Sequence, residues 1–239
     1  MGKKKVLYLG ASGMIGPHLT PGLVDDYDMT LADVKPHPDG LPIEHVDITD
    51  YRQVLAASEG MDAIMNFTVV RGDADLSFHV NTRGAWHVMK AAHELGIGKV
   101  IHSGPESVRQ HEDHSFDLGD IPPSPGSGYY GATKLLSREL CRSWARAYGI
   151  ETICFLFNGL GVAPTEPVVG KDFPPFFIVW SDLHTACKLA LEIESVPDSY
   201  QEFNLHSHLG QEKFSIEKAR EMLGYEPARN MAEMYRRAT

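Results

Sequence analysis

The fold is decided by the stretch Val6-Leu7-Tyr8-Leu9-Gly10-Ala11-Ser12-Gly13-Met14-Ile15-Gly16. Its four leading apolar residues predict a buried strand, and glycines follow at the first, fourth and seventh positions of the turn. Small residues there let the backbone approach a pyrophosphate, which can lie on the N–H groups at the start of the next helix. The stretch therefore predicts a dinucleotide-binding turn formed by Gly10, Ser12, Gly13, Met14, Ile15 and Gly16.

Asp33 ends the next expected strand, about 20 residues after the glycine turn. A carboxylate at this place can accept hydrogen bonds from both hydroxyls of a ribose, and it repels a 2′-phosphate. NAD is therefore the expected cofactor rather than NADP, although the neighbouring Lys35 reduces the preference. The alternative is that the glycines form only a tight turn and Asp33 only caps a strand.

Strand-like and helical segments alternate along the chain, a pattern that favours a parallel sheet with helical crossovers. Strands are expected at residues 6–9, 29–34, 45–48, 63–68, 100–103 and 152–157, with a further one after Phe203. Helices are expected at residues 51–58, 76–95 and 130–148. Pro17 fits the first turn of the first crossover helix, whereas Pro21 should kink or shorten that helix.

The length of 239 residues and the hydrophobic content of 43% suit one substantial core and are short for two independent domains. We expect an α/β fold with a Rossmann-type doubly wound parallel sheet over residues 1–160. Residues 161–239 should form a small C-terminal substrate-binding lobe that does not fold on its own. The net charge of −10 would repel nucleic acid and anionic membranes, so a small molecule is the expected partner.

No apolar stretch approaches the roughly 18 residues that span a bilayer, and no short apolar region precedes a cleavage site. A soluble cytoplasmic protein is expected, in which Cys141, Cys154 and Cys187 are buried free thiols. The densest group of possible metal ligands is His111-Glu112-Asp113-His114 with Asp117 and Asp120. Because this spacing is not a zinc pattern, we expect a solvated loop there and no metal.

Tyr130 and Lys134 stand four residues apart, so a helix would place both on one face, about 6 Å from each other. An ammonium at that distance favours a phenolate over a phenol, which lets the tyrosine act as a base. A tyrosine and a lysine at this spacing also occur on solvated helix faces. The pair therefore indicates an active site only in combination with the glycine turn.

With these features the chain resembles the extended short-chain dehydrogenase/reductases, the NAD-dependent epimerase/dehydratase family. The run Tyr129-Tyr130-Gly131-Ala132-Thr133-Lys134-Leu135-Leu136 closely matches the active-site helix of that family. Other segments are similar to its cofactor groove and later landmarks: His45-Val46-Asp47-Ile48, Asn66-Phe67-Thr68, Asn81-Thr82-Arg83-Gly84 and Phe157-Asn158. The resemblance implies that Asp47, Ile48, Phe67, Thr68 and Asn81 bind the cofactor and that Asn158 binds substrate.

The resemblance also implies a mechanism and an assembly. Tyr130 would take a hydroxyl proton, while Lys134 would bind the nicotinamide ribose and stabilise the phenolate. The compact layout is similar to members of the uronate dehydrogenase type, which oxidise a free sugar acid. A homodimer formed through the helices at 76–95 and 130–148 is expected on the same ground.

Two departures from the family pattern affect these expectations. Pro105 stands where the family has a serine or threonine that hydrogen-bonds the reacting oxygen, so Ser103 or Ser107 would have to replace it. Phe155 or Leu156 stands where the family tends to carry an arginine. The carboxylate of a sugar acid would then need Arg71 or, as the alternative, Arg109.

Three functions are compatible with these residues. The leading hypothesis is an NAD-dependent dehydrogenase that acts on a hydroxyl or hemiacetal of a small sugar or sugar acid. The second is an epimerase or dehydratase that keeps its NAD bound and regenerates it. The third, suggested by Pro105, is a catalytically impaired protein that binds and senses NAD(H).

Overall fold

The main sheet of the protein is parallel, as the alternating sequence pattern predicted. The computed structural model describes residues 2–105, 128–157, 159–169, 177–207, 215–228 and 230–236. Within these residues seven strands pair in the order β10-β6-β5-β4-β1-β2-β3. Their bounds are Lys5–Leu9 (β1), Asp28–Asp33 (β2), Glu44–His45 (β3), Ala63–Asn66 (β4), Lys99–Pro105 (β5), Glu151–Phe157 (β6) and Tyr200–Asn204 (β10).

The order of the strands reverses between β1 and β4. The chain runs outward through β2 and β3 on one side of β1, then returns to β4 and runs outward through β5, β6 and β10. At the carboxyl ends of β1 and β4, Leu9 lies beside Asn66. In sheets of this kind ligands bind in the crevice outside such a reversal, so the topology itself marks the region of a site.

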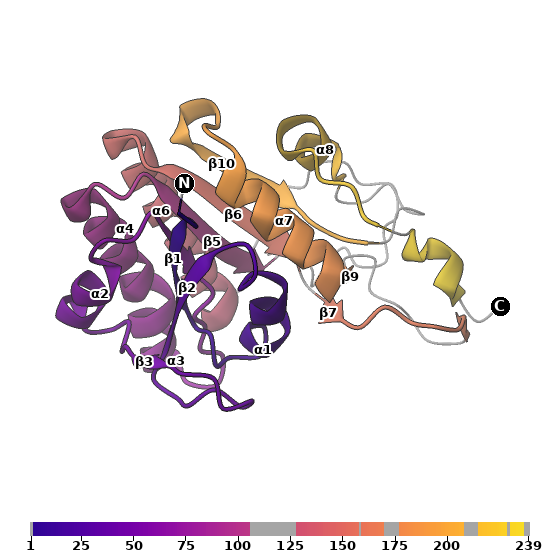
Figure 1. Ribbon diagram of the computed structural model, residues 1–239, viewed down its shortest axis with the longest axis horizontal. Coiled ribbons are helices and arrows are strands. Elements are labelled where there is room, and N and C mark those ends of the chain that lie inside the picture. The colour runs from indigo at the N-terminus through magenta and orange to yellow at the C-terminus, as the bar shows by residue number, and fades with distance from the viewer. Residues whose placement is uncertain are drawn as a thin grey trace.

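Helices cover both faces of the sheet (Figure 1). One face is covered by α2 (Tyr51–Ser58), α4 (Gly84–Leu95) and α6 (Tyr129–Tyr148), and the other by α1 (Gly16–Leu19), α7 (Trp180–Glu192) and α8 (Glu217–Leu223). Each face has its own apolar core, and Cys141 and Cys154 lie in one while Cys187 lies in the other. All three thiols are buried and free, as predicted. The Rossmann-type, doubly wound architecture is confirmed.

The first crossover helix is short, as Pro17 and Pro21 predicted. The α-helical part, α1, has four residues with Pro17 in its first turn, and the 3₁₀ helix Thr20–Gly22 (η1) follows it with Pro21 inside. Because a helix of this length has a weak dipole, a phosphate at this turn would depend mainly on individual N–H groups.

Two elements differ from the sequence prediction. The expected strand at 45–48 pairs only over β3, because the Asp47 side chain accepts hydrogen bonds from the N–H and hydroxyl of Thr49 and turns the backbone. The expected helix at 76–95 consists of α3 (Ala74–Ser77), a π-helical segment at Phe78–Arg83 (η2) and α4. π-Helical turns of this kind are frequent at functional sites.

Residues on both sides of the domain boundary expected at residue 160 contribute strands to the main sheet. Strand β10 pairs with β6 and ends at Asn204, earlier than the strand expected after Phe203, and α7 packs on β5. The remaining elements are β7 (Gly159–Gly161) paired with β9 (Phe177–Val179), β8 (Val168–Val169) paired with β11 (Tyr235–Arg236), and the 3₁₀ helices η3 (Pro197–Ser199) and η4 (Met231–Met234). None of the helices in the described ranges is both long enough and apolar enough to cross a membrane.

Candidate active site

The glycine turn brings the end of β1 against the end of β4. Gly10 has a φ of +89°, and a Cβ placed on it would lie 2.9 Å from the backbone of Phe67 and Thr68. A Cβ on Gly16 would lie 1.8 Å from the carbonyl oxygen of Ala11. Both positions require glycine, Gly10 because of its backbone conformation and Gly16 because of close packing.

Asp33 lies at the carboxyl end of β2, beside this turn. Its carboxylate accepts hydrogen bonds from the backbone N–H of Ser12 and of Lys35, each at 3.0 Å. Among the described residues, none accepts a hydrogen bond from the backbone N–H of Met14 or Ile15. The turn therefore offers two donors for a phosphate, next to a carboxylate placed to accept from hydroxyls.

A cavity of about 330 Å³ opens at the carboxyl ends of the strands. It brings together residues that the sequence analysis selected from four separate segments. These residues are Met14 and Ile15 after β1, Phe67 and Arg71 after β4, Ser103 in β5, and Tyr130 and Lys134 in α6. Its wall is completed by Val69, Gly104, Phe157 and Leu160, which no sequence pattern had marked as site residues, apart from Phe157 as a family landmark. The cavity lies where the strand order reverses, which is the place that the topology marks.

Tyr130 and Lys134 share one face of α6 and both line the cavity. The guanidinium carbon of Arg71 lies 5.2 Å from the centre of the Tyr130 ring, within the range of a cation–π contact. Arg71 follows the end of β4, so the loop after this strand places a cation directly over the phenol.

Lys134 is buried to 2% exposure, although its Nζ has no hydrogen-bond partner among the described residues. Burial lowers the pKa of Lys134 to about 8, and the positive charges of Arg71 and Arg138 add to the effect. A buried ammonium without a protein partner is costly, and hydroxyl groups of a ligand in the cavity would supply the missing acceptors.

Ser103 is buried near the end of β5 and lines the cavity. Pro105 ends the same strand, at the position where the family pattern has its hydroxyl. The preceding residue, His102, is a hydrogen-bonded core histidine: its Nε2 lies 2.9 Å from the hydroxyl of Ser137, and burial holds its pKa well below the ordinary value. Of the two candidate serines, Ser103 lines the cavity, and Ser107 lies outside the residues that the structure describes.

Asn81 lies in the π-helical segment η2 and does not line the cavity. Its side-chain oxygen accepts from the N–H of Val70, and its amide nitrogen donates to the carbonyl of Val70 and to the hydroxyl of Thr133. Because protein partners take up this amide, Asn81 ties the loop before Arg71 to helix α6 rather than contacting the cavity.

The other expected cofactor residues lie around the same sheet edge. Ile48 is buried and its side chain packs against Gly84, while Asp47 forms the turn with Thr49. The hydroxyl of Thr68 donates to the side chain of Asn66 at 2.7 Å.

Several residues expected at a site lie outside the described residues: Ser107, Arg109, Asn158 and the possible metal ligands at 111–120. Within the part of the chain that the structure describes, no group of three histidine, cysteine, aspartate or glutamate side chains is arranged to hold a metal ion.

A model of the NAD dependent epimerase/dehydratase family matches residues 6–176 of this chain. The chain belongs to this family. An epimerase/dehydratase of this family is an NAD-dependent enzyme, so NAD is the cofactor to be tested against the site.

Curated relatives of this epimerase/dehydratase family member include proteins that match it along nearly their whole length. The uncharacterized protein YtbQ of Bacillus subtilis is 28% identical, covering 97% of this chain and 96% of the relative. The NAD-dependent glucose-6-phosphate dehydrogenase of Haloferax volcanii is 23% identical over 95% of this chain and 94% of its own. The uronate dehydrogenase of Pseudomonas putida is 29% identical over 62% of this chain and 58% of its own.

Solved structures share the fold of this chain. A mutant uronate dehydrogenase from Agrobacterium tumefaciens, complexed with NAD, superposes with a TM-score of 0.81 at 19% identity and covers 97% of this chain and 87% of that chain. A UDP-galactose 4-epimerase superposes with a TM-score of 0.77 at 17% identity, covering 96% and 95%.

The residues of this chain fit NAD. The Gly10 position has no room for a side chain, and the Asp33 carboxylate lies beside the glycine turn. Lys134 lines the cavity, and its buried Nζ has no hydrogen-bond partner among the described residues. Each observation is accounted for by a dinucleotide that runs from β2, over the glycine turn, to the cavity.

Proposed function

We propose that this protein is an NAD-dependent oxidoreductase that oxidises a hydroxyl or hemiacetal group of a small sugar or sugar acid. The observation that supports it is the cavity of about 330 Å³, in which Tyr130, Lys134, Ser103 and Arg71 meet beside the glycine turn. This volume is at the lower end of the range for ligand pockets, about 300–1,000 Å³, which favours a small substrate.

The proposed chemistry divides between cofactor and protein. Bound NAD supplies the hydride acceptor. Tyr130 accepts the proton of the substrate hydroxyl at its phenolic oxygen, and the Ser103 hydroxyl donates a hydrogen bond to the reacting oxygen. The Lys134 ammonium binds ribose hydroxyls and stabilises the phenolate form of Tyr130. In this proposal Ser103 does what the serine or threonine at the position of Pro105 does in other family members.

Arg71 is proposed to bind an anionic group of the substrate. The relatives from Pseudomonas putida and Haloferax volcanii are named for uronate and for glucose 6-phosphate, both anionic sugars. Arg71 is the cation other than Lys134 among the described residues that line the cavity, and its planar guanidinium suits a carboxylate. A sugar acid is therefore the preferred substrate class.

The test is a screen of aldoses and uronic acids with NAD, followed by the absorbance of NADH. We expect net NADH formation with a uronic acid and a loss of at least about a hundredfold in kcat in Tyr130→Phe, because the proton acceptor is removed. Tyr129→Phe is the matched control, since Tyr129 begins the same helix but does not line the cavity, and its kcat should stay within about twofold.

The other two hypotheses predict different results in the same screen. An epimerase or dehydratase that recycles its cofactor would convert substrate without net NADH. A sensor would bind NAD with unchanged affinity in wild type and Tyr130→Phe and turn over no sugar in either. Either outcome would replace the oxidoreductase proposal.

The role of Arg71 is tested separately. Arg71→Met should raise KM for a uronic acid by about tenfold or more and leave KM for the corresponding neutral aldose nearly unchanged. Arg83→Met, at an exposed position of η2, serves as the control. Equal effects on both substrates would show that Arg71 does not recognise a carboxylate.

A further inference from the structure

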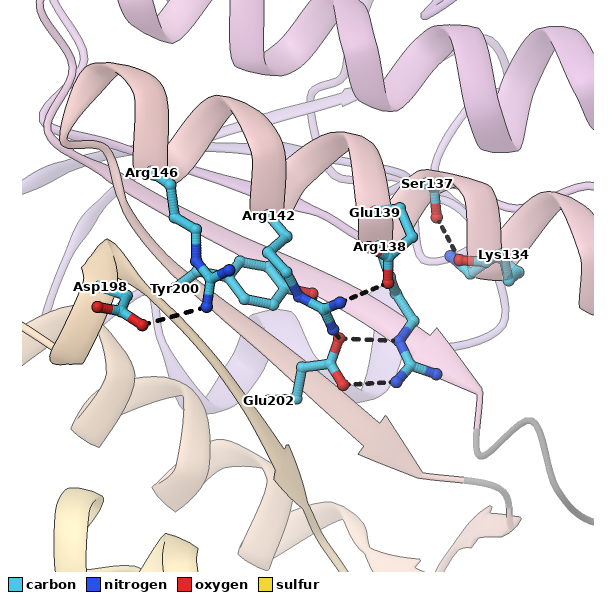
Figure 2. A network of polar contacts seen from close by, with 9 residues as sticks. All are labelled: Lys134, Ser137, Arg138, Glu139, Arg142, Arg146, Asp198, Tyr200 and Glu202. Atoms are coloured by element: carbon cyan, nitrogen blue, oxygen red, sulfur yellow. Dashed lines mark hydrogen bonds and ion pairs between the residues drawn. The ribbon is translucent and has the colours of Figure 1, made fainter. Parts of the chain in front are cut away.

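A charged network joins helix α6 to the outer strand β10, and Figure 2 shows it beside Lys134. The guanidinium of Arg138 bonds the carboxylate of Glu202 at two points, from Nε to Oε1 at 3.1 Å and from an Nη to Oε2 at 2.5 Å. Arg142 and the Tyr200 hydroxyl also donate to Oε1, at 2.9 and 2.7 Å. Glu202 is thus held by three donors from two elements.

Arg138 is unusually deep for a charged residue, at 2% exposure. Its side chain passes close to the end of β5, where a Cβ on Gly104 would lie 3.1 Å from the Arg138 Cδ. Gly104 and its neighbour Ser103 line the cavity. The stem of Arg138 therefore lies against Gly104 of the cavity wall without lining the cavity itself.

Arg138 is one helical turn beyond Lys134, so both side chains leave α6 on the same face. The other titratable groups around this pair are Arg71, Cys141 of α6, Cys154 of β6, His102 of β5 and Tyr200 of β10. Burial raises the pKa of both thiols and of Tyr200 and lowers that of His102, so these four stay neutral near pH 8. Among the described residues, the fixed charges around Lys134 and Arg138 are therefore Arg71 and Arg138 beside Lys134, and Glu202 with its second partner Arg142 beside Arg138.

We propose that Arg138 and Glu202 are positioning residues for the cofactor-binding Lys134. Glu202 of strand β10 fixes the Arg138 guanidinium against one face of α6. The positive charge of Arg138 then repels the Lys134 ammonium one helical turn away. The inference rests on the proposed function in one respect, the assignment of Lys134 to the cofactor ribose.

The two partners act on Lys134 with opposite signs. The Arg138 charge opposes the ammonium and the Glu202 charge favours it. Removing Arg138 alone leaves Glu202, so Lys134 should keep its proton to a higher pH. Neutralising Glu202 alone removes the negative charge beside Arg138 and Arg142, so Lys134 should lose its proton at a lower pH. Removing both charges should bring the pH at which Lys134 loses its proton back toward the wild-type value.

The experiment is titration calorimetry with NAD from about pH 6 to about pH 10, where the free enzyme loses the Lys134 ammonium. The affinity of wild type for NAD should fall as the pH rises past about 8, the pKa of Lys134. We expect the midpoint of this fall to move up by about half a pH unit or more in Arg138→Met and down by a similar amount in Glu202→Gln. The double variant should lie between them.

Matched controls distinguish an effect of the Arg138 charge on Lys134 from a general loss of structure around α6. Arg138→Lys keeps the charge and should keep the wild-type midpoint. Arg146→Met and Asp198→Asn break a 3.1 Å ion pair that joins the same helix to η3 but is largely exposed, and they should leave the midpoint unchanged. If Arg138→Met does not fold, the downward shift in Glu202→Gln together with the unchanged midpoint of Arg138→Lys carries the test.

Shifts of the two single variants in the same direction, no shift in either, or a wild-type affinity independent of pH would overturn the inference. Because the measured quantity is binding of NAD, failure to turn over any sugar would count against the proposed function alone. NADH formation by wild type with unshifted midpoints would count against this inference alone.

Discussion

Lys134 carries a charge in a place where a charge is costly. Its pKa falls from an ordinary value of 10.5 to about 8 on folding, chiefly because of burial. Between these values the unfolded chain binds a proton that the folded chain does not, so the free energy of unfolding should rise with pH across this window. Below pH 8 the whole penalty, about 3 kcal/mol, remains.

Replacing Lys134 with methionine should therefore stabilise the protein without cofactor. At pH 7 we expect Lys134→Met to raise the free energy of unfolding by about 1–3 kcal/mol, and Tm by about 2–4 °C for each kcal/mol. The same variant should lose most of its affinity for NAD. Thermal unfolding with and without NAD measures both effects.

Lys188→Met is the control for this change, because Lys188 forms an exposed ion pair with Asp26 and should alter stability by less than about 1 kcal/mol. A Lys134→Met variant that unfolds more easily than wild type without NAD would show that the ammonium has a protein partner.

Asp33 should decide between NAD and NADP. Its carboxylate accepts hydrogen bonds from the backbone N–H of Ser12 in the glycine turn and from that of Lys35 after β2, and its charge would repel a 2′-phosphate. Asp33→Asn should weaken NAD binding by about tenfold and reduce the preference over NADP by a similar factor. Competition binding with both cofactors measures this, with the exposed Asp39→Asn as control; an unchanged ratio of affinities would rule out this role of Asp33.

At this scale, residues with strong local signals could be predicted and residues that depend on distant partners could not. The glycine spacing and the spacing of Tyr130 and Lys134 selected residues that line one cavity, and their roles stay predictions. Arg138 carried no signal, because its partner Glu202 lies 64 residues later and joins it only through the pairing of β10 with β6. Asn81 was assigned to the cofactor, but its amide is taken up by Val70 and Thr133.

Among the elements, η2 and α6 are linked by hydrogen bonds of Asn81, and these bonds hold the loop before Arg71 and the first turn of α6 in place. Asn81 bonds the loop at Val70 and the hydroxyl of Thr133, which in turn donates to the carbonyl of Tyr130. Its removal should cost about 2 kcal/mol of stability, because three hydrogen bonds are lost at a buried position.

Asn81→Ala should also lower kcat/KM by more than tenfold, because Arg71 and Tyr130 lose their support. Thermal unfolding and NADH formation measure the two effects. Thr82→Ala, which removes one nearby hydrogen bond to the Thr133 carbonyl, is the control. Loss of stability with unchanged kcat/KM would limit Asn81 to a structural role.

The elements themselves could be predicted where local chemistry dominates. Helix α2 spans the expected residues 51–58, and the two prolines shorten α1 as expected. β3 is shorter than its apolar pattern because Asp47 bonds its own backbone turn, an effect that hydrophobic alternation does not reveal. β10 ends at Asn204, before the strand expected after Phe203, and its buried Tyr200 and Phe203 do not alternate with polar residues one by one.

For the whole molecule, the homodimer implied by the family resemblance stays a prediction. Leu136 and Tyr148 of α6 are 45% and 50% exposed, and Leu95 of α4 is 38% exposed. These apolar side chains lie on the helices through which the dimer is expected. Sedimentation velocity should show a dimer for wild type and a monomer for Leu136→Glu, because an unpaired charge would be buried at the contact.

Leu41→Glu is the matched control for the assembly, since Leu41 is exposed to a similar degree, 40%, but lies between β2 and β3. It should leave the sedimentation coefficient unchanged. A monomeric wild type would contradict the expected dimer.

The pairing of Arg138 with a strand that comes more than 60 residues later has a consequence for synthesis on the ribosome. While the chain emerges, α6 is complete well before Glu202 leaves the exit tunnel, so the Arg138 guanidinium must remain hydrated. It can enter the interior only when β10 docks, because a buried cation without its carboxylate is too costly. The surroundings of Arg138 should therefore take their final form only after β10 has been made, later than the last described residue of the cavity wall, Leu160.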